Sequence, residues 1–273
     1  IGATAGRTTL NGEGLQHQDG HSHILASTIP NCVSYDPTYA YELAVIVQDG
    51  MRRMYEEMES VFYYITTMNE NYTMPEMPKG SEEGIIKGIY LLEDSTAKEY
   101  KVAKPASKDV TLRLLGSGTI LREVREAAAV IRKQYSINVD VWSVTSFNEL
   151  RKEALGVQRE NLLNPGKKPK LPFITKQLSN REGPVVATTD YMKAHSDQVR
   201  EFVPGSYRVM GTDGFGRSDT RENLRHFFEV DTKFVVLAAL SELKELGLIT
   251  AKQISEHMKK TGIESNKANP LDQ

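Results

Sequence analysis

An alternation of short apolar strands and amphipathic helices constrains the fold most. From residue 109 to the end of the chain, strands are predicted at 110–115, 138–144, 184–188 and 207–210. Helices are predicted at 119–135, near 147–155, and at 191–202, 220–228, 232–246 and 250–262. Strands that alternate with helices at this spacing indicate a parallel sheet flanked by helices. Because the strand segments are almost continuously apolar, we expect the sheet to be buried on both faces.

The amino-terminal part of the chain is less regular. Apolar residues at spacings of three and four predict a helix over 38–58, and an aromatic, β-branched run predicts a strand over 61–67. Residues 84–92 suit either a short helix or a strand, residues 1–23 have the composition of a loop, and the polar stretch 93–108 is the best linker or surface excursion. Proline-broken loops are expected at 69–80 and 161–172.

Composition narrows the class of protein. Hydrophobic residues make up 39% of the chain and charged residues 26%, a balance typical of a soluble globular protein. With 34 basic and 36 acidic residues the net charge is -2, so no bulk positive field attracts nucleic acid or anionic lipid. A single cysteine, Cys32, excludes an internal disulfide and a Cys-rich zinc site. We therefore expect a cytoplasmic protein that binds neither nucleic acid nor a membrane.

The first residues of the chain are unusual. The sequence opens Ile1-Gly2-Ala3-Thr4 without an initiator Met and without the pattern of a signal peptide. This opening resembles the end of a buried strand that runs into a glycine loop. We therefore expect a piece of a longer protein that carries only part of a functional site.

Two glycine-rich turns follow predicted strands. A dinucleotide-binding fingerprint at Gly116-Ser117-Gly118 would need a third glycine where Leu121 stands, so a structural tight turn is the better interpretation. The second turn runs over 211–216 and is followed by Arg217 and Arg221, which could hold an anion at the start of the next helix. We favour a structural loop tied by local ion pairs here, and Ser218 or Asp219 could cap the helix that follows.

Residues 11–23 are the densest in titratable groups. Three of the six histidines, His17, His21 and His23, fall within this stretch. They could form a metal site, with or without Asp19, although the spacing matches no known zinc helix motif. The other two interpretations are a plain polar loop and a catalytic loop in which Glu13 and His17 exchange protons.

The remaining histidines and the methionines suggest structural roles. His195, His226 and His257 lie on predicted helices and are expected to be surface or hydrogen-bonded helix residues. Core packing is expected of six methionines: Met51, Met54, Met58, Met68, Met74 and Met77.

The histidine-rich loop also carries a family resemblance. Residues 3–23 (ATAGRTTLNGEGLQHQDGHSH) resemble the homodimeric bacterial type of pyruvate dehydrogenase, the decarboxylating first component of its complex. The resemblance continues through 28–50, 63–80, 114–127, 142–150, 189–192 and 207–231. It is weakest over 93–108 and 156–182.

The resemblance implies an architecture and a place for this chain in a longer, transketolase-like protein. Residues 1–77 would be the carboxyl-terminal portion of the middle domain, which binds the pyrimidine of thiamine diphosphate. Residues 78–273 would form a transketolase carboxyl-terminal-like α/β domain with a mostly parallel sheet. The Gly-Asp-Gly motif that binds the cofactor's diphosphate through Mg²⁺ is absent, since Thr212-Asp213-Gly214 lacks the first glycine. No residue of this chain is therefore assigned to cofactor or metal binding.

The resemblance also implies an activity, in which pyruvate is oxidatively decarboxylated and a lipoyl carrier is reductively acetylated. Glu13 and His17 correspond to active-site residues of the family, whereas His21 and His23 match without an assigned role. The implied partners are a second subunit of a homodimer, the lipoyl-bearing acetyltransferase component, and pyruvate as substrate. The isolated chain is expected to be inactive. The alternative interpretation is a non-catalytic assembly or interaction module with the same fold.

Overall fold

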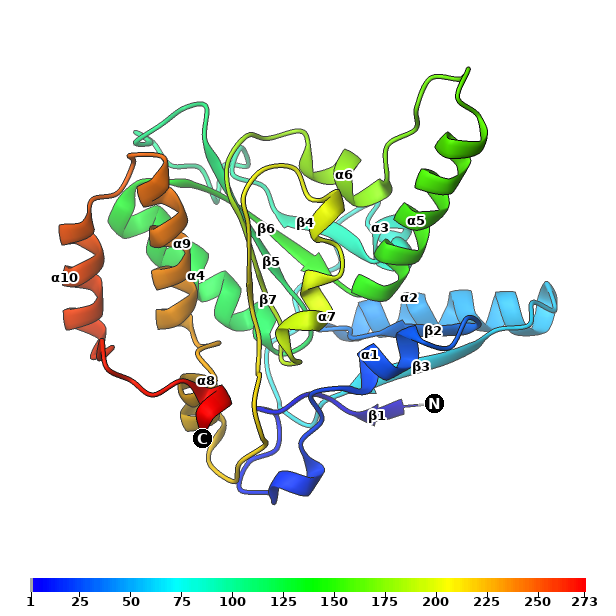
Figure 1. The fold of residues 1–273 in the computed structure, drawn as a ribbon, viewed down its shortest axis with the longest axis horizontal. Coiled ribbons are helices and arrows are strands. Elements are labelled where there is room, and N and C mark those ends of the chain that lie inside the picture. Colours follow the sequence, from blue (N-terminus) through cyan, green and yellow to red (C-terminus); the bar gives the residue numbers. More distant parts are fainter. Residues whose placement is uncertain (1) are drawn as a thin grey trace.

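The computed structural model describes residues 2–273, with side chains from residue 5 onward, and contains two sheets with helices around them (Figure 1). The first sheet is parallel in the order β1-β3-β2, formed by β1 (Gly2–Thr4), β2 (Cys32–Tyr35) and β3 (Phe62–Thr67). The second has the order β4-β6-β5-β7-β8, formed by β4 (Ile89–Glu93), β5 (Thr111–Gly116), β6 (Asn138–Val144), β7 (Val185–Thr188) and β8 (Tyr207–Met210). In that sheet only β4 is antiparallel to its neighbour. The prediction of a mostly parallel α/β fold is therefore confirmed.

Helices cover both faces of the second sheet. The longer ones are α4 (Ile120–Tyr135), α5 (Phe147–Leu163), α9 (Thr232–Glu245) and α10 (Ala251–Thr261), and the shorter ones are α6 (Phe173–Leu178), α7 (Lys193–Asp197) and α8 (Arg221–Phe227). The first sheet is accompanied by α1 (Ser22–Ser27), α2 (Ala40–Met51) and α3 (Glu82–Lys87). Short 3₁₀ turns lie at Leu15–His17, Arg200–Phe202 and Pro270–Asp272, and a π-helical turn at Arg52–Glu56 prolongs α2.

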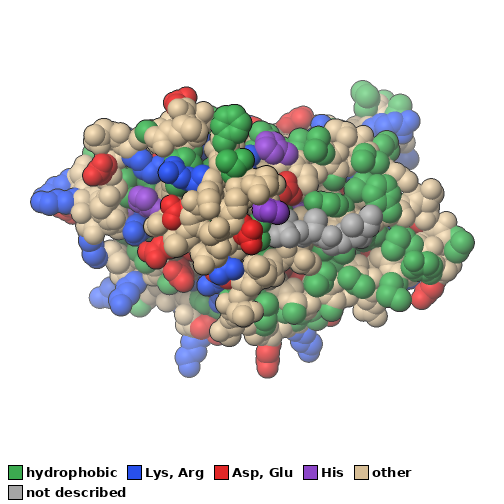
Figure 2. Space-filling model, turned by 90° about the horizontal axis from the view of Figure 1, so that it is seen from below, with side chains coloured by type: hydrophobic (Ala, Val, Ile, Leu, Met, Phe, Trp, Pro, Cys, Tyr) green, Lys and Arg blue, Asp and Glu red, His purple; other side chains and the backbone are tan. Residues whose placement is uncertain are grey.

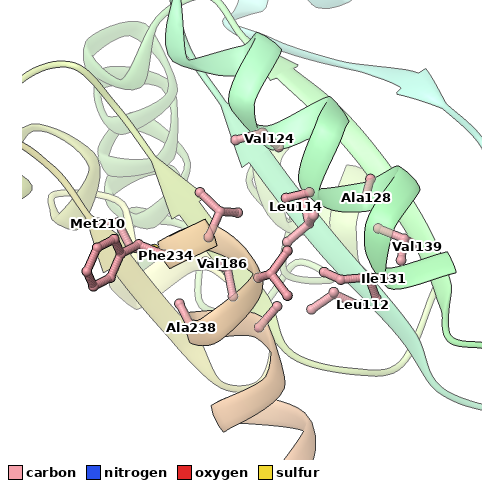
Figure 3. Close-up of a cluster of buried hydrophobic side chains, with 14 of the residues drawn as sticks. Leu112, Leu114, Val124, Ala128, Ile131, Val139, Val186, Met210, Phe234 and Ala238 are labelled. Atoms are coloured by element: carbon pink, nitrogen blue, oxygen red, sulfur yellow. The ribbon is translucent and has the colours of Figure 1, made fainter. Parts of the chain in front are cut away.

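Strand β5 shows why the second sheet is buried on both sides. Leu112 and Leu114 point into a core formed with α4 and α9, where Val124, Ala128 and Phe234 meet them (Figure 3). Leu115, on the opposite face, packs in a second core beneath α5 and α6. A strand between two helical layers needs apolar residues on both faces, and these near-continuous apolar runs supply them.

Buried Arg113 lies in the middle of the same strand. Its guanidinium donates to the carbonyl of Leu178 over 2.7 Å and to the carbonyls of Gly183 and Pro204. Burial lowers the pKa of Arg113 to about 10. The side chain therefore holds together three connecting segments at one end of the sheet, because it donates hydrogen bonds to a main-chain carbonyl in each.

Several predicted boundaries need correction. The helix near 147–155 continues to Leu163 as α5, so the expected loop at 161–172 starts later. The single helix expected over 191–202 consists of α7 and a separate 3₁₀ turn, because Gln198 donates to the carbonyl of His195 over 2.7 Å and ends α7 early. The ambiguous segment 84–92 contains both alternatives, α3 followed by β4.

Other corrections concern elements and side chains that the pattern did not reveal. Strand β2 and helices α1 and α6 have no counterpart in the sequence prediction. Met51, Met58 and Met74 are exposed and not in the core as expected. These methionines lie at the end of α2 and in the loops beside the first sheet, where the described part of the chain leaves its apolar surface uncovered.

Candidate functional site

The histidine-rich loop lies where the two sheets meet. It follows β1 and runs beside the ends of β7 and β8, at the bottom of Figure 1. The amide of Arg7 donates to the carbonyl of Asp190 over 3.3 Å, and the amide of Asp19 donates to the carbonyl of Gly6 over 3.0 Å. In α/β proteins the carboxyl ends of parallel strands are the usual place for a functional site.

Glu13 and His17 both lie at the exposed tip of this loop. His17 ends the 3₁₀ turn Leu15–His17, and the side chains of both residues are exposed. Within residues 2–273, neither side chain has a hydrogen-bonding or ion-pair partner. Both are therefore available to a group that lies outside the described chain. Figure 2 shows this face, where histidine side chains lie among acidic and basic ones.

The base of the loop is held by the buried side chain of Asp190. Gly6 has a φ of 64°, and a Cβ there would lie 2.0 Å from Oδ2 of Asp190, so only glycine allows this approach. Asp190 Oδ2 accepts from the amide of Thr8 over 3.1 Å, and the amide of Gly6 donates to the hydroxyl of Tyr191 over 3.1 Å. Burial raises the pKa of Asp190 to about 7.

The buried side chain of Asp36 supports the first glycine-rich turn. Gly118 has a φ of 50°, and a Cβ there would lie 2.5 Å from Oδ2 of Asp36. Thr66 donates its hydroxyl to Asp36 Oδ1 over 2.8 Å, and burial raises the pKa of Asp36 to about 7. Beneath the turn, a Cβ on Gly116 would lie 2.7 Å from the Cα of Leu121. These contacts favour the structural interpretation of Gly116-Ser117-Gly118.

His23 is buried beneath the loop and is part of the packing. Its ring stacks on His195 with 4.9 Å between centroids and meets Tyr191 edge-on at 4.6 Å. Its Nε2 lies 3.0 Å from the hydroxyl of Thr66. Burial lowers the pKa of His23 to about 3, so the imidazole is neutral at physiological pH.

The histidines on the later helices have different environments. His195 is fully buried in α7, its Nδ1 lies 3.5 Å from Nε2 of Gln198, and burial lowers its pKa well below the ordinary value. His226 Nδ1 lies 3.0 Å from Asp231 Oδ2. His257 is buried and its Nε2 lies 3.0 Å from the carbonyl of Lys233. The expectation of surface or hydrogen-bonded helix residues therefore suits all three histidines.

The metal alternative finds no support in this geometry. His21 is exposed beside the Arg7 guanidinium, at 3.4 Å, and Asp19 accepts from the amides of His21 and Ser22. With His23 buried, the histidines of the loop do not converge. Among residues 2–273, no group of three or more His, Cys, Asp or Glu side chains could hold a metal ion. No helix within the same residues is long and apolar enough to cross a membrane.

The turn over 211–216 continues into α8 as a structural loop. Thr220 caps this helix by accepting from the amide of Asn223 over 3.3 Å, so the expected cap at Ser218 or Asp219 is wrong. Arg217 lies over the ring of Phe227, 4.3 Å from its centroid. Arg221 donates through Nε to the carbonyl of Thr9 over 2.7 Å. Both arginines are therefore engaged with protein groups, which favours the structural interpretation.

Sequence reasoning did not assign Asp36, Asp190 or Gln18 to the site. Asp36 and Asp190 each stand just after a buried apolar strand, β2 and β7, and an acid at that position is a recognisable signal. Gln18, which pairs with the main chain of Arg217, offers no comparable signal because its partner lies 199 positions away.

Comparisons with known proteins divide the chain into two matches. Residues 1–75 match the family described as "Pyruvate dehydrogenase E1 component middle domain". Residues 88–231, more than half of the chain, match the "Transketolase-like TK C-terminal domain".

Curated relatives resemble the chain along its whole length. The pyruvate dehydrogenase E1 component of Pseudomonas aeruginosa is 60% identical over 273 residues, and that of Escherichia coli K12 is 56% identical over 272 residues. These alignments cover 100% and 99% of this chain, but 30% and 29% of the relatives. The chain therefore spans about a third or less of the length of the proteins that it resembles.

Solved transketolases share the fold at much lower identity. Transketolase from Campylobacter jejuni superposes with a TM-score of 0.60 at 18% identity, over 88% of this chain and 30% of the transketolase. Transketolase from Pichia stipitis with sedoheptulose 7-phosphate gives 0.61 at 16% identity, over 90% and 30% of the two chains. At this identity the likeness shows the fold alone.

Proposed function

Because this chain belongs to the family of transketolase-like carboxyl-terminal domains and resembles pyruvate dehydrogenase E1 components along its whole length, we propose that it is the carboxyl-terminal part of such a component. The proposed activity of the complete protein is oxidative decarboxylation of pyruvate with reductive acetylation of a lipoyl carrier. The observation that carries the proposal is the identity of 50–60% along the chain with proteins of that name. The exposed side chains of Glu13 and His17, which have no hydrogen-bonding partner within residues 2–273, also support the proposal.

Thiamine diphosphate with Mg²⁺ is the cofactor that we propose for the complete protein. When bound, it supplies the carbanion chemistry that cleaves the bond to a carboxylate. The residues described here do not fit the Mg²⁺-diphosphate end of this cofactor. Asp213 accepts from the amide of Lys193 over 2.8 Å, and no acidic cluster accompanies it within residues 2–273. We therefore place that part of the site outside this chain.

Glu13 and His17 suit the reacting end of the site. An imidazole can hold or release a proton near neutral pH, and a carboxylate can orient an imidazole or accept a proton from it. We propose that His17 orients the substrate or moves a proton near the reacting carbon, and that Glu13 orients His17 or the bound substrate. To orient the substrate or move a proton, the two side chains must not be engaged in hydrogen bonds within their own loop.

The proposed partners follow from the same assignment. We propose a cytoplasmic homodimer that acts in pyruvate metabolism with a lipoyl-bearing acetyltransferase component. Five exposed apolar side chains in or next to α1, the π-helical turn after α2, and β3 support a protein interface there: Leu25, Ile29, Tyr55, Met58 and Phe62. Hydrophobic side chains gather on that half of the molecule in Figure 2. The net charge of -2 gives the chain no bulk positive field that would attract nucleic acid.

Substitution of the two loop residues in the full-length enzyme tests the assignment. We expect His17→Ala and Glu13→Gln each to lower the turnover of pyruvate several-fold or more, because each removes a group that moves or orients a proton. CO₂ release and reduction of an added acceptor would be measured at saturating pyruvate. Glu264→Gln, at an exposed position near the end of the chain, is the control and should turn over like the wild type. Unchanged turnover in both loop variants would refute the roles.

A further inference from the structure

The loop that carries Glu13 and His17 is hydrogen-bonded to residues 217–221, a segment distant in sequence. Gln18, the residue after His17, pairs with the main chain of Arg217. Its Oε1 accepts from the amide of Arg217 over 2.8 Å, and its Nε2 donates to the carbonyl of the same residue. A main-chain amide can only donate and a carbonyl can only accept, so the two contacts define the orientation of the Gln18 amide group.

Further contacts join the two segments on the other side of Glu13. The amide of Gly12 donates to the carbonyl of Asp219 over 2.9 Å, and the amide of Arg221 donates to Oδ1 of Asn11 over 3.2 Å. The residues before Glu13 and after His17 are thus both tied to 217–221. The side chains of Glu13 and His17 take no part in these bonds.

The two segments also approach each other closely. A Cβ on Gly216 would lie 2.9 Å from the carbonyl oxygen of Leu15 and 3.0 Å from Oε1 of Gln18. Leu15 begins the 3₁₀ turn that ends at His17. Only a residue without a side chain lets the main chain of the carboxyl-terminal domain come this close to the turn.

The holding segment is itself well anchored. The side chain of Arg217 lies over the ring of Phe227 in α8, 4.3 Å from its centroid, and Thr220 caps that helix. The guanidinium of buried Arg7 donates to the carbonyl of Gly214. Because a capped helix and a buried arginine fix the position of this segment, the segment can in turn fix the position of the loop.

We propose that residues 216–221 are a clamp through which the carboxyl-terminal domain positions the loop of Glu13 and His17, and that Gln18 is its positioning residue. This inference rests on the proposed function of that loop. The carboxyl-terminal domain would then contribute to the reaction by positioning this loop, although none of the domain's own side chains is assigned a catalytic role. Main-chain bonds and Gln18 set the position of the loop, and the functional side chains stay free for the substrate.

Kinetics of the full-length enzyme test the clamp. Gln18→Met keeps the length of the side chain but loses both bonds to Arg217. We expect kcat to fall about ten- to a hundredfold, with the KM for pyruvate within about twofold of the wild type, because a misplaced reacting group slows the chemical step. Gln18→Glu keeps the acceptor but sets a second carboxylate oxygen against the carbonyl of Arg217, so its kcat should also fall below that of the wild type. Gln134→Met, on the exposed side of α4, is the matched control and should match the wild type.

Hydrogen exchange provides a readout that does not depend on activity. In Gln18→Met, the amides of Gly12, His17 and Arg217, all hydrogen-bonded in the wild type, should exchange at least tenfold faster. The exchange of the core strand β5 should be unchanged, as it should be everywhere in Gln134→Met. A wild type that does not turn over pyruvate would refute the proposed function and leave the exchange result to decide on the clamp. An active wild type with unchanged kcat in Gln18→Met, or unchanged exchange at these amides, would overturn the clamp.

Discussion

Asp36 and Asp190 are two fully buried carboxylic acids at the junction of the two sheets. Each has one oxygen, Oδ2 of Asp36 and Oδ1 of Asp190, without a hydrogen-bonding partner among the described residues. A buried acid avoids the cost of an unpaired charge by keeping its proton, which agrees with pKa values raised to about 7 by burial. The groups near Asp190 include Arg225, whose charge lowers its pKa, and Glu70, whose charge raises it.

The pH dependence of stability should therefore be opposite to that of an ion-paired carboxylate. In the unfolded chain an aspartic acid loses its proton near pH 3.8, whereas folded Asp190 keeps its proton up to about pH 7. The folded state binds more protons between these values, so the stabilisation is complete below pH 3.8 and is lost as the pH rises through about 7. We expect the free energy of unfolding of wild type, relative to that of Asp190→Asn, to fall by up to about 1.4 kcal/mol per pH unit in that window.

Urea unfolding at several pH values from 4.5 to 7.5 measures this difference. Asp109→Asn is the control, because Asp109 is exposed and its substitution should leave the pH profile of the wild type intact. A difference between wild type and Asp190→Asn that is constant across the range would contradict a proton held by Asp190 in the folded state.

At the scale of elements, the segment 84–92 shows how one residue resolves an ambiguous pattern. Gly88 ends α3 with a φ of 106° and turns the chain directly into β4. Its carbonyl accepts from the amides of Thr145 and Ser146, over 2.9 and 3.2 Å. A Cβ at Gly88 would lie 2.4 Å from the carbonyl oxygen of Ser146. The turn therefore needs glycine for its backbone conformation and for the close approach.

Two substitutions of glycine by alanine should have opposite effects on stability. Gly88→Ala should lower the free energy of unfolding by about 1–3 kcal/mol, because it adds backbone strain and a clash with Ser146. Gly156→Ala is the matched control within α5, where a Cβ would meet nothing within 4 Å. It should raise the free energy of unfolding by about 0.5–1 kcal/mol, since alanine favours a helix interior.

Denaturant unfolding of the two variants and the wild type gives both values. Equal effects of the two substitutions would show that neither the positive φ nor the contact at Gly88 limits the turn.

At the scale of the whole molecule, an ion-pair network ties the loop after the first sheet to the second sheet's helices. Glu70 accepts from Arg122 of α4 over 2.6 Å and from buried Arg225 of α8. Although burial opposes its ionisation, the hydrogen bonds and charges of Arg225 and Arg122 lower the pKa of Glu70 to about 2. Ile85 and Tyr90 pack against the first sheet as well. We propose a domain boundary between residues 77 and 78, although the side chains on its two sides pack closely together.

We have proposed that the residues that bind the diphosphate lie outside this chain. We therefore expect that these 273 residues alone do not turn over pyruvate. With thiamine diphosphate and Mg²⁺ added, the purified chain should release no CO₂ above a protein-free blank, because the residues that hold the diphosphate are placed elsewhere. The full-length enzyme under the same conditions is the positive control. Pyruvate-dependent CO₂ release by the pure chain would refute this division.

The sequence by itself determined the elements whose signal is local. The apolar periodicity of α4 and α9, the continuous apolar strands β5 to β8 and the composition of the loop with Glu13 and His17 can all be identified without a structure. The resemblance of that loop to a known family also needed no coordinates, because it is carried by consecutive residues.

Tertiary structure alone decided which distant groups meet. The burial of His23 against His195, the raised pKa values of Asp36 and Asp190, and the pairing of Gln18 with Arg217 all depend on residues far apart along the chain. Such contacts leave no periodic trace, because a side chain's protonation and hydrogen-bonding partners depend on what packs around it in three dimensions. The sequence therefore indicates which loop carries the chemistry, and the tertiary structure decides how that loop is held.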